Sequence, residues 1–269
     1  MSDLWFKDLD ELELVEGALL LNSQIDPQVN FTWVEMQLEK LLDEAEQVLS
    51  VEVNEKARFD AFLRLFYQEW GFEGDYENYF SSENAFIEKV IQRRKGIPVS
   101  LGALLLFFGR KLGFPVKGIS FPTQFLIAVN WSDRDKSYVN PFNGEYVAKP
   151  VLHAWLKGQE GAAAQLKPEH LNVADNSMLI GRWLGVLKSA LMREERYTQA
   201  LACTDIALSL VPDDPYEIRD RGFIYQHLEC NQVAQKDFEY FLEKCPDDPT
   251  AELLKLQLKA LQEVPQVLH

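Results

Sequence analysis

A four-residue string that occurs twice constrains the fold of this chain more than any other feature. Pro-Asp-Asp-Pro stands at positions 212–215 and again at positions 246–249. The spacing between the two strings matches the period of about 34 residues that is typical of solenoid units built from two antiparallel helices. With the two strings in register, Ala200 aligns with Ala234, and each lies at a helix start where a small side chain lets neighbouring helices approach. The sequence therefore predicts a stacked helical array at its C-terminal end.

The second repeat unit resembles a tetratricopeptide repeat closely. Its small and aromatic positions follow the pattern of that repeat: Gly222, Tyr225, Ala234, Phe238 and Pro246. The first unit is degenerate, because Lys188 stands where a small residue is usual. We expect repeat units at about 181–214 and 215–248, followed by a capping helix over 251–263 that covers the last open face. The array as a whole is predicted to span residues 176–269.

Arrays of this kind offer two interpretations. A groove between the helices can bind a peptide or a partner helix, and the candidate residues are Tyr225, Arg219 and Lys188. The alternative is that the array only stabilises the rest of the chain. We expect a protein or peptide partner.

The overall charge excludes several classes of partner. The 269 residues carry 27 Lys and Arg against 42 Asp and Glu, a net charge of −15. Binding to nucleic acid needs clustered basic residues, and an anionic membrane surface would repel this chain, so we expect neither. The three cysteines and four histidines show no metal-binding spacing, and we expect no metal and no cofactor. The odd cysteine count and the absence of an apolar signal segment favour the cytoplasm.

The remaining residues indicate an α+β fold that is predominantly helical. The first ninety residues show apolar positions at helical spacing. A helix is predicted from Pro98 to Leu112, since proline suits the first turn and Gly113 ends the apolar run. Short β-rich runs follow at 116–119, 125–129 and 138–139, with a hairpin loop expected over 129–137. A small antiparallel sheet should therefore flank the start of this helix.

The middle of the chain resembles a known family. The segments FYQEWGFEGDYENYF, RRKGIPVSLGALLLFFGRKLGFPVKGISFP and NPFNGE look like the bacterial SirB-type family, a transglutaminase-like domain with C-terminal tetratricopeptide repeats. The resemblance covers essentially the whole chain. It implies a papain/transglutaminase-like core within residues 1–175, ahead of the repeat array.

Active members of the parent fold use Cys at a helix start, His on one strand and Asp on the next. By that resemblance, Ser100 is nearest to the nucleophile position, to within one or two residues. Gln124 stands where many relatives have His, and Asn140 where relatives often have Asp. Glutamine has no nitrogen that accepts a proton near neutral pH, and a lone serine is a poor nucleophile without a base. The resemblance therefore implies a degenerate site.

These substitutions favour a non-catalytic interaction or regulatory protein, a pseudoenzyme. Ser100, Thr123, Gln124 and Asn140 would converge as uncharged hydrogen-bonding groups, which suit an amide or a peptide carbonyl. The alternative is a hydrolase or acyltransferase of the transglutaminase-like class that uses Ser100 or an unrecognised group. A third hypothesis, suggested only by the family's naming, is regulation of gene expression through a protein partner.

Overall fold

The fold was analysed in a computed structural model that describes residues 11–52 and 54–263. The chain divides into two compact units, one up to Trp183 and one from Leu184 onward. The boundary expected from the sequence lay earlier, at 175/176. The difference arises because the first half of helix α7 (Asn176–Arg193) packs on the first unit, where Trp183 Nε1 donates to the Ala85 carbonyl (2.9 Å).

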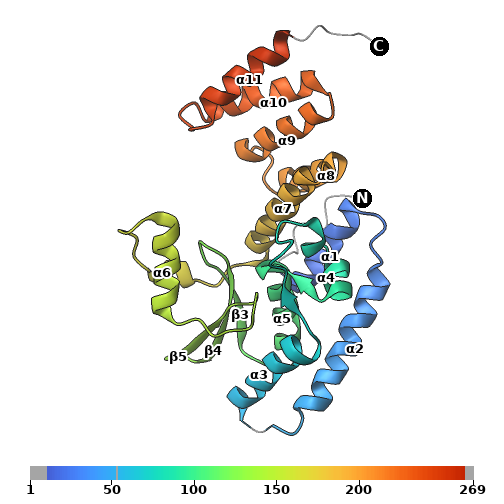
Figure 1. The fold of residues 1–269 in the computed structure, drawn as a ribbon, viewed down its shortest axis with the longest axis vertical. Coiled ribbons are helices and arrows are strands. Elements are labelled where there is room, and N and C mark those ends of the chain that lie inside the picture. Colours follow the sequence, from blue (N-terminus) through green and yellow to red (C-terminus); the bar gives the residue numbers. More distant parts are fainter. Residues whose placement is uncertain (1–10, 53, 264–269) are drawn as a thin grey trace. The chain divides into compact units, whose positions relative to one another are not determined.

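The first unit is built around the buried helix α5 (Pro98–Lys111). Residues 98–109 of α5 are all buried, as an apolar run with no polar face requires. The other helices of this unit are α1 (Leu14–Ile25), α2 (Phe31–Leu49), α3 (Glu55–Arg64), α4 (Ile87–Arg93) and α6 (Lys149–Glu160) (Figure 1). Asn30 and Asn54 begin α2 and α3 as N-caps, each accepting a backbone N–H with its side chain.

A three-stranded antiparallel sheet lies against α5. Its strands are β3 (Val116–Ser120), β4 (Phe125–Ser132) and β5 (Asp135–Val139), in that order. The predicted strands are confirmed, but the loop expected over 129–137 is wrong in length. Asn130 pairs with Lys136 and Ser132 with Asp135, so only the two residues between Ser132 and Asp135 form the hairpin turn. A short parallel ladder joins β1 (Glu73–Gly74) to β2 (Lys95–Gly96) just before α5.

The second face of the sheet is covered by α6. Leu152 and Leu156 of α6 pack with Leu126, Ala128 and Tyr138 of β4 and β5 in one buried cluster. The sheet thus packs apolar side chains on both faces, so a ligand would have to bind at the ends or edges of its strands. Among the described residues, no helix combines the length and the apolar character needed to cross a membrane.

The second unit is a stack of helical hairpins. It contains the rest of α7, then α8 (Tyr197–Leu210), α9 (Pro215–His227), α10 (Asn231–Lys244) and α11 (Ala251–Glu263). Glu195 and Glu229, at equivalent positions of the two repeats, both have positive φ (59° and 61°) in the turns that join the paired helices. Ala200 and Ala234 are fully buried, as predicted for the close helix contacts. The repeat in the sequence is therefore also a repeat in the structure.

Candidate functional site

The three positions singled out by sequence come from one end of the sheet and the start of α5. The register pairs Ile127 with Val139, so Gln124, just before β4, and Asn140, just after β5, lie at the same end. Helix α5 packs closely there, because a Cβ on Gly102 would lie 2.2 Å from the Phe125 ring. The three positions thus have the topology that the resemblance to a papain-like core implies.

Ser100 is used by the helix rather than presented to a substrate. Its side chain is 0% exposed, and its Oγ accepts from the Ile97 N–H and donates to the Ile97 carbonyl, both at 3.1 Å. The hydroxyl therefore caps the first turn of α5 in both directions. A nucleophile needs access and a base within hydrogen-bond reach. Among the described residues, the buried Ser100 hydroxyl has hydrogen bonds to the Ile97 backbone and to no titratable side chain.

Gln124 and Thr123 leave buried polar atoms unpaired. Within the described part of the chain, neither Gln124 Nε2 nor Thr123 Oγ1 has a hydrogen-bond partner, although both atoms are buried. Buried polar atoms are nearly always paired in folded proteins, since an unpaired one costs about 1–3 kcal/mol. Two such atoms, on adjacent residues, lie at this end of the sheet.

Asn140 builds the turn that follows β5. Its Oδ1 accepts the Phe142 N–H (3.0 Å), and its carbonyl accepts the Gly144 N–H (2.8 Å). The next carbonyl, that of Pro141, accepts the hydroxyl of Tyr67 (2.7 Å), and burial raises the pKa of Tyr67 well above its usual value. The Asn140 side chain is thus committed to an Asx turn, a role that aspartate fills equally well.

An aromatic rim adjoins this turn and was missed by sequence reasoning. It consists of the exposed side chains of Tyr76, Tyr79 and Phe80 and of the half-buried ring of Phe142. The Phe142 ring contacts Tyr76 (4.5 Å between centroids) and Tyr79 (5.8 Å), and Phe80 is 62% exposed. The signal was present in the stretch GDYENYF, which places three aromatics within five residues. Exposed aromatics of this density are typical of protein contact surfaces.

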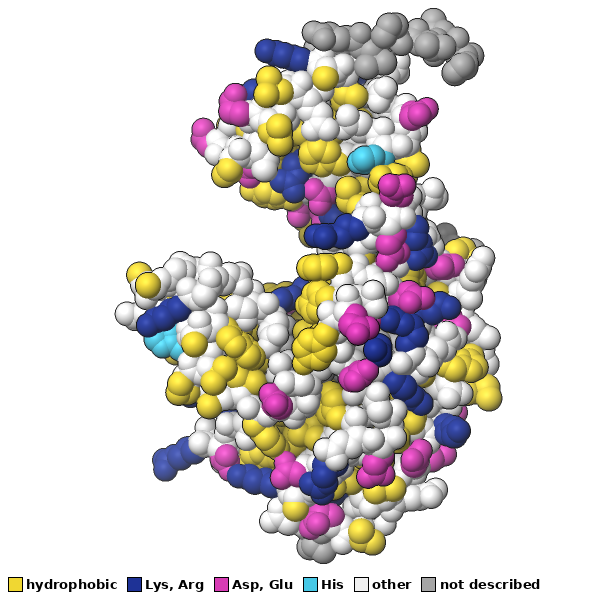
Figure 2. All heavy atoms as spheres, in the orientation of Figure 1, with side chains coloured by type: hydrophobic (Ala, Val, Ile, Leu, Met, Phe, Trp, Pro, Cys, Tyr) yellow, Lys and Arg dark blue, Asp and Glu magenta, His cyan; other side chains and the backbone are white. Residues whose placement is uncertain are grey.

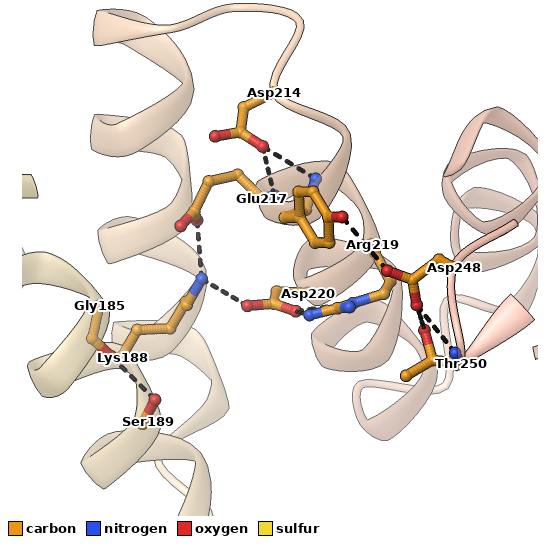
Figure 3. A network of polar contacts seen from close by, with 10 residues as sticks. Gly185, Lys188, Ser189, Asp214, Glu217, Arg219, Asp220, Asp248 and Thr250 are labelled. Carbon is orange, nitrogen blue, oxygen red and sulfur yellow. Dashed lines mark hydrogen bonds and ion pairs between the residues drawn. The ribbon is translucent and has the colours of Figure 1, made fainter. Parts of the chain in front are cut away.

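The three array candidates all make contacts within the second unit. Lys188 is 4% exposed, and its Nζ lies 2.6 Å from Asp220 and 2.8 Å from Glu217 (Figure 3). Burial alone would lower the pKa of Lys188, but the two carboxylates outweigh burial and raise it. Lys188 is therefore a buried structural cation and not a surface residue. It occupies the position where the repeat usually has a small side chain, and its ion pairs with Glu217 and Asp220 neutralise the buried charge.

Arg219 and Tyr225 are also engaged within the second unit. Arg219 Nη2 lies 2.9 Å from Asp220 (Figure 3). The Arg219 guanidinium also lies 5.2 Å from the centre of the Phe241 ring. Tyr225 is half-buried against the cluster formed by α10 and α11. Each therefore has a packing role, and only part of each side chain faces solvent.

The cysteines divide between core and surface. Cys203 is buried, and burial raises the pKa of its thiol to about 12. Cys230 is exposed and Cys245 is half-buried. Cys230 stands at the N-cap of α10, a turn position, which explains its exposure. No cluster of three His, Cys, Asp or Glu side chains suited to a metal occurs among the described residues.

Comparisons with known proteins divide the chain in the same two parts. Residues 32–185 match the transglutaminase-like superfamily, and residues 187–259 match the tetratricopeptide repeat. A UPF0162 protein of Vibrio cholerae is 63% identical over 270 residues, covering 100% of both chains. Protein SirB1 of Salmonella typhimurium and the UPF0162 protein YchA of Escherichia coli are 37% and 36% identical over 262 residues, 97% of each chain. No solved structure matches the chain significantly.

Proposed function

Because the chain belongs to the transglutaminase-like family of SirB1 and the UPF0162 proteins, we propose that it is a non-catalytic protein-interaction module. The observation that carries this proposal is the state of Ser100. The hydroxyl nearest the nucleophile position is fully buried and occupied on both sides by Ile97. Gln124 adds no titratable nitrogen, so proton transfer from that hydroxyl has no acceptor at this position.

A binding role is supported by what the site retains. The unpaired atoms of Thr123 and Gln124 lie at the sheet end, and the aromatic rim adjoins the Asn140 turn. A peptide offers a carbonyl for the Gln124 amide and apolar side chains for the rim. The repeat array supplies a second surface of the kind that binds peptides in tetratricopeptide proteins.

The catalytic part of the proposal is tested with a fluorophosphonate serine probe and with amidase and amine-transfer assays. We expect no labelling and no turnover by the full chain. Ser100→Ala is the specific control, and Ser189→Ala, an exposed serine on α7, is the matched one. Activity that disappears in Ser100→Ala and persists in Ser189→Ala would instead establish the hydrolase or acyltransferase alternative.

The binding part is tested by capture from native lysate, read by mass spectrometry. The full chain is compared with Gln124→Leu, Phe80→Glu and Tyr225→Glu, each checked for folding by circular dichroism. Val211→Glu is the matched surface control, because Val211 is 57% exposed in the second unit. We expect a reproducible prey that the control retains and at least one of the site variants loses. A prey retained by all three site variants would contradict binding at both surfaces.

A further inference from the structure

A groove of about 600 Å³ lies in the first unit along the outer edge of β5, away from the degenerate site. Its walls come from β5 itself, from residues 146–149 and from α3. Trp131 and Tyr146 line it together with Lys56, Lys136 and Lys149. We call it the β5 groove. No sequence motif pointed to it, because its walls are brought together from segments that are distant in the sequence.

The backbone of β5 is unpaired where the groove opens. Residues 145–147 pair with the last part of the strand: Val147 N–H donates to the Tyr138 carbonyl (2.8 Å), and Asn140 N–H to the Glu145 carbonyl (2.9 Å). The chain then turns away into α6 at Lys149. The backbone N–H and C=O groups of successive residues point to opposite edges of a strand, so those of Lys136 point to the same edge as those of Tyr138 and Asn140. Among the described residues, no strand pairs with Lys136 on that edge, so its N–H and C=O face the groove.

The charge of the groove is opposite to that of the chain. Three lysines line it against one carboxylate, Asp60, which accepts the Tyr146 hydroxyl (2.6 Å). Lys56 is already held, since its Nζ lies 2.5 Å from Asp135. Lys136 and Lys149 have no ion-pair partner in the described part of the chain. Figure 2 shows acidic and basic side chains interspersed over the visible face of the first unit, so this local excess of lysine is not part of a broad basic field.

We propose that the β5 groove binds an extended acidic segment of a partner protein, which continues the sheet beside Lys136. The backbone of the segment pairs with the free edge of β5. It continues the line of residues 145–147, whose own pairing with β5 ends where the chain enters α6 at Lys149. Its acidic side chains meet Lys136 and Lys149, and its apolar side chains pack on Trp131. The proposal concerns a different surface from the repeat array and the degenerate site, so its variants separate it from the function proposed above.

The charge arm of the test uses a fluorescein-labelled nonapeptide of alternating Glu and Val, titrated with the full chain and read by fluorescence anisotropy. We expect binding that weakens as salt rises. The double variant Lys136→Glu/Lys149→Glu should weaken it at least about tenfold, because two attractive contacts become repulsive. Lys117→Glu is the matched control: this lysine is exposed on the opposite edge strand, β3, and its variant should change affinity less than about twofold.

The backbone arm compares two substitutions of one residue. Lys136→Gln removes the charge and keeps the N–H, while Lys136→Pro removes both, and proline is tolerated on edge strands. We expect Lys136→Pro to bind about fivefold more weakly than Lys136→Gln, the effect of one lost hydrogen bond. If the proline variant fails to fold, exchange of the Lys136 amide hydrogen in the unmodified chain replaces it, and peptide should slow that exchange at least about tenfold.

Three outcomes would overturn the proposal. The first is no saturable binding of the peptide at low salt. The second is equal affinity of Lys136→Pro and Lys136→Gln, or an exchange rate that peptide leaves unchanged, since either removes sheet extension. The third is equally tight binding of a single-stranded DNA of the same charge, which would make the groove a general polyanion site.

Discussion

Buried polar groups are treated in opposite ways in the repeat array and at the end of the sheet in the first unit. In the second unit, Lys188 meets two carboxylates, and the cluster continues through Asp220 to Arg219 (Figure 3). At the end of the sheet in the first unit, the Thr123 hydroxyl and the Gln124 amide are buried without partners. The difference indicates that polar residues of the array maintain the fold, whereas those of the degenerate site are kept at a cost in stability. Costs of that kind are typical of places that bind something.

The largest effect should come from removing the buried cation of the array. Lys188→Met leaves Glu217 and Asp220 facing each other without their cation, which should destabilise the second unit by about 2–4 kcal/mol. Hydrogen exchange of the α9 amides measures the stability of the second unit separately from that of the first. Lys244→Met is the control, because Lys244 forms an exposed pair with Glu243 and should change stability by less than about 0.5 kcal/mol. Unchanged protection of α9 would show that the cluster does not support the array.

An ion pair in the first unit should behave like the array cluster and show a pH dependence. Asp75 is fully buried and lies 2.6 Å from Arg93. Burial alone would raise the pKa of Asp75, but the Asn78 N–H and the Arg93 guanidinium outweigh it and lower the pKa below 3.8. A lowered pKa in the folded state means that stability is present above the unfolded pKa and is lost as pH falls through the folded one.

Asp75→Asn should therefore cost about 2–3 kcal/mol at neutral pH, since it leaves Arg93 without its buried partner. The difference from the unmodified chain should shrink below pH 3.8. Urea unfolding followed by tryptophan fluorescence reports on the first unit, because all six tryptophans precede Leu184. A difference that is constant from pH 7 to pH 3 would contradict the assignment.

Ser100→Ala tests whether the hydroxyl is a cap. The variant loses the two hydrogen bonds to Ile97, and we expect a loss of about 1–2 kcal/mol in the same tryptophan-detected unfolding. Ser189→Ala, which loses an exposed bond to the Gly185 carbonyl, should change exchange in α7 by less than about 0.5 kcal/mol. A neutral Ser100→Ala would instead show that the serine is retained for a reason other than the start of α5.

The smallest expected change in stability gives the sharpest test, because its sign should differ between Thr123→Val in the first unit and Thr204→Val in the second. Thr123→Val removes a buried hydroxyl that has no partner and keeps the shape, so it should stabilise the first unit by about 0.5–1 kcal/mol. Thr204→Val removes a buried hydroxyl that donates to the Ala200 carbonyl (3.2 Å) and should be neutral or destabilise by up to about 1 kcal/mol. The first is read by tryptophan fluorescence and the second by exchange in α8. Destabilisation by Thr123→Val would mean that its hydroxyl is paired in solution.

Much of the fold was predictable because its signals are local. The helix from Pro98 was expected to end at Leu112 and ends at Lys111, since proline, an apolar run and Gly113 act within a few residues of one another. The hairpin was less predictable. Polar residues from Asn130 to Lys136 read as loop, but pairing between the strands outweighs their low preference for β structure.

The proposal about the chemistry of this site rests on side-chain identity. Gln124 and Asn140 cannot titrate near neutral pH in any environment, and the resemblance places them where relatives have histidine and aspartate, so the expectation of a degenerate site needs no geometry. The repeat period likewise determined the helical array, because each repeat forms its own hairpin and contacts only its neighbours.

Only the tertiary structure decided which polar residues are free. Lys188 of α7 stands where the repeat usually has a small residue, and only the fold shows that Glu217 and Asp220 of α9, two helices further along the chain, pair with its ammonium group. The β5 groove depends on contacts such as Tyr146 with Asp60, 86 residues apart. Burial and pairing are properties of the packed chain, since residues distant in sequence supply the partners, and so the surfaces offered to a ligand were fixed by packing and not by local pattern.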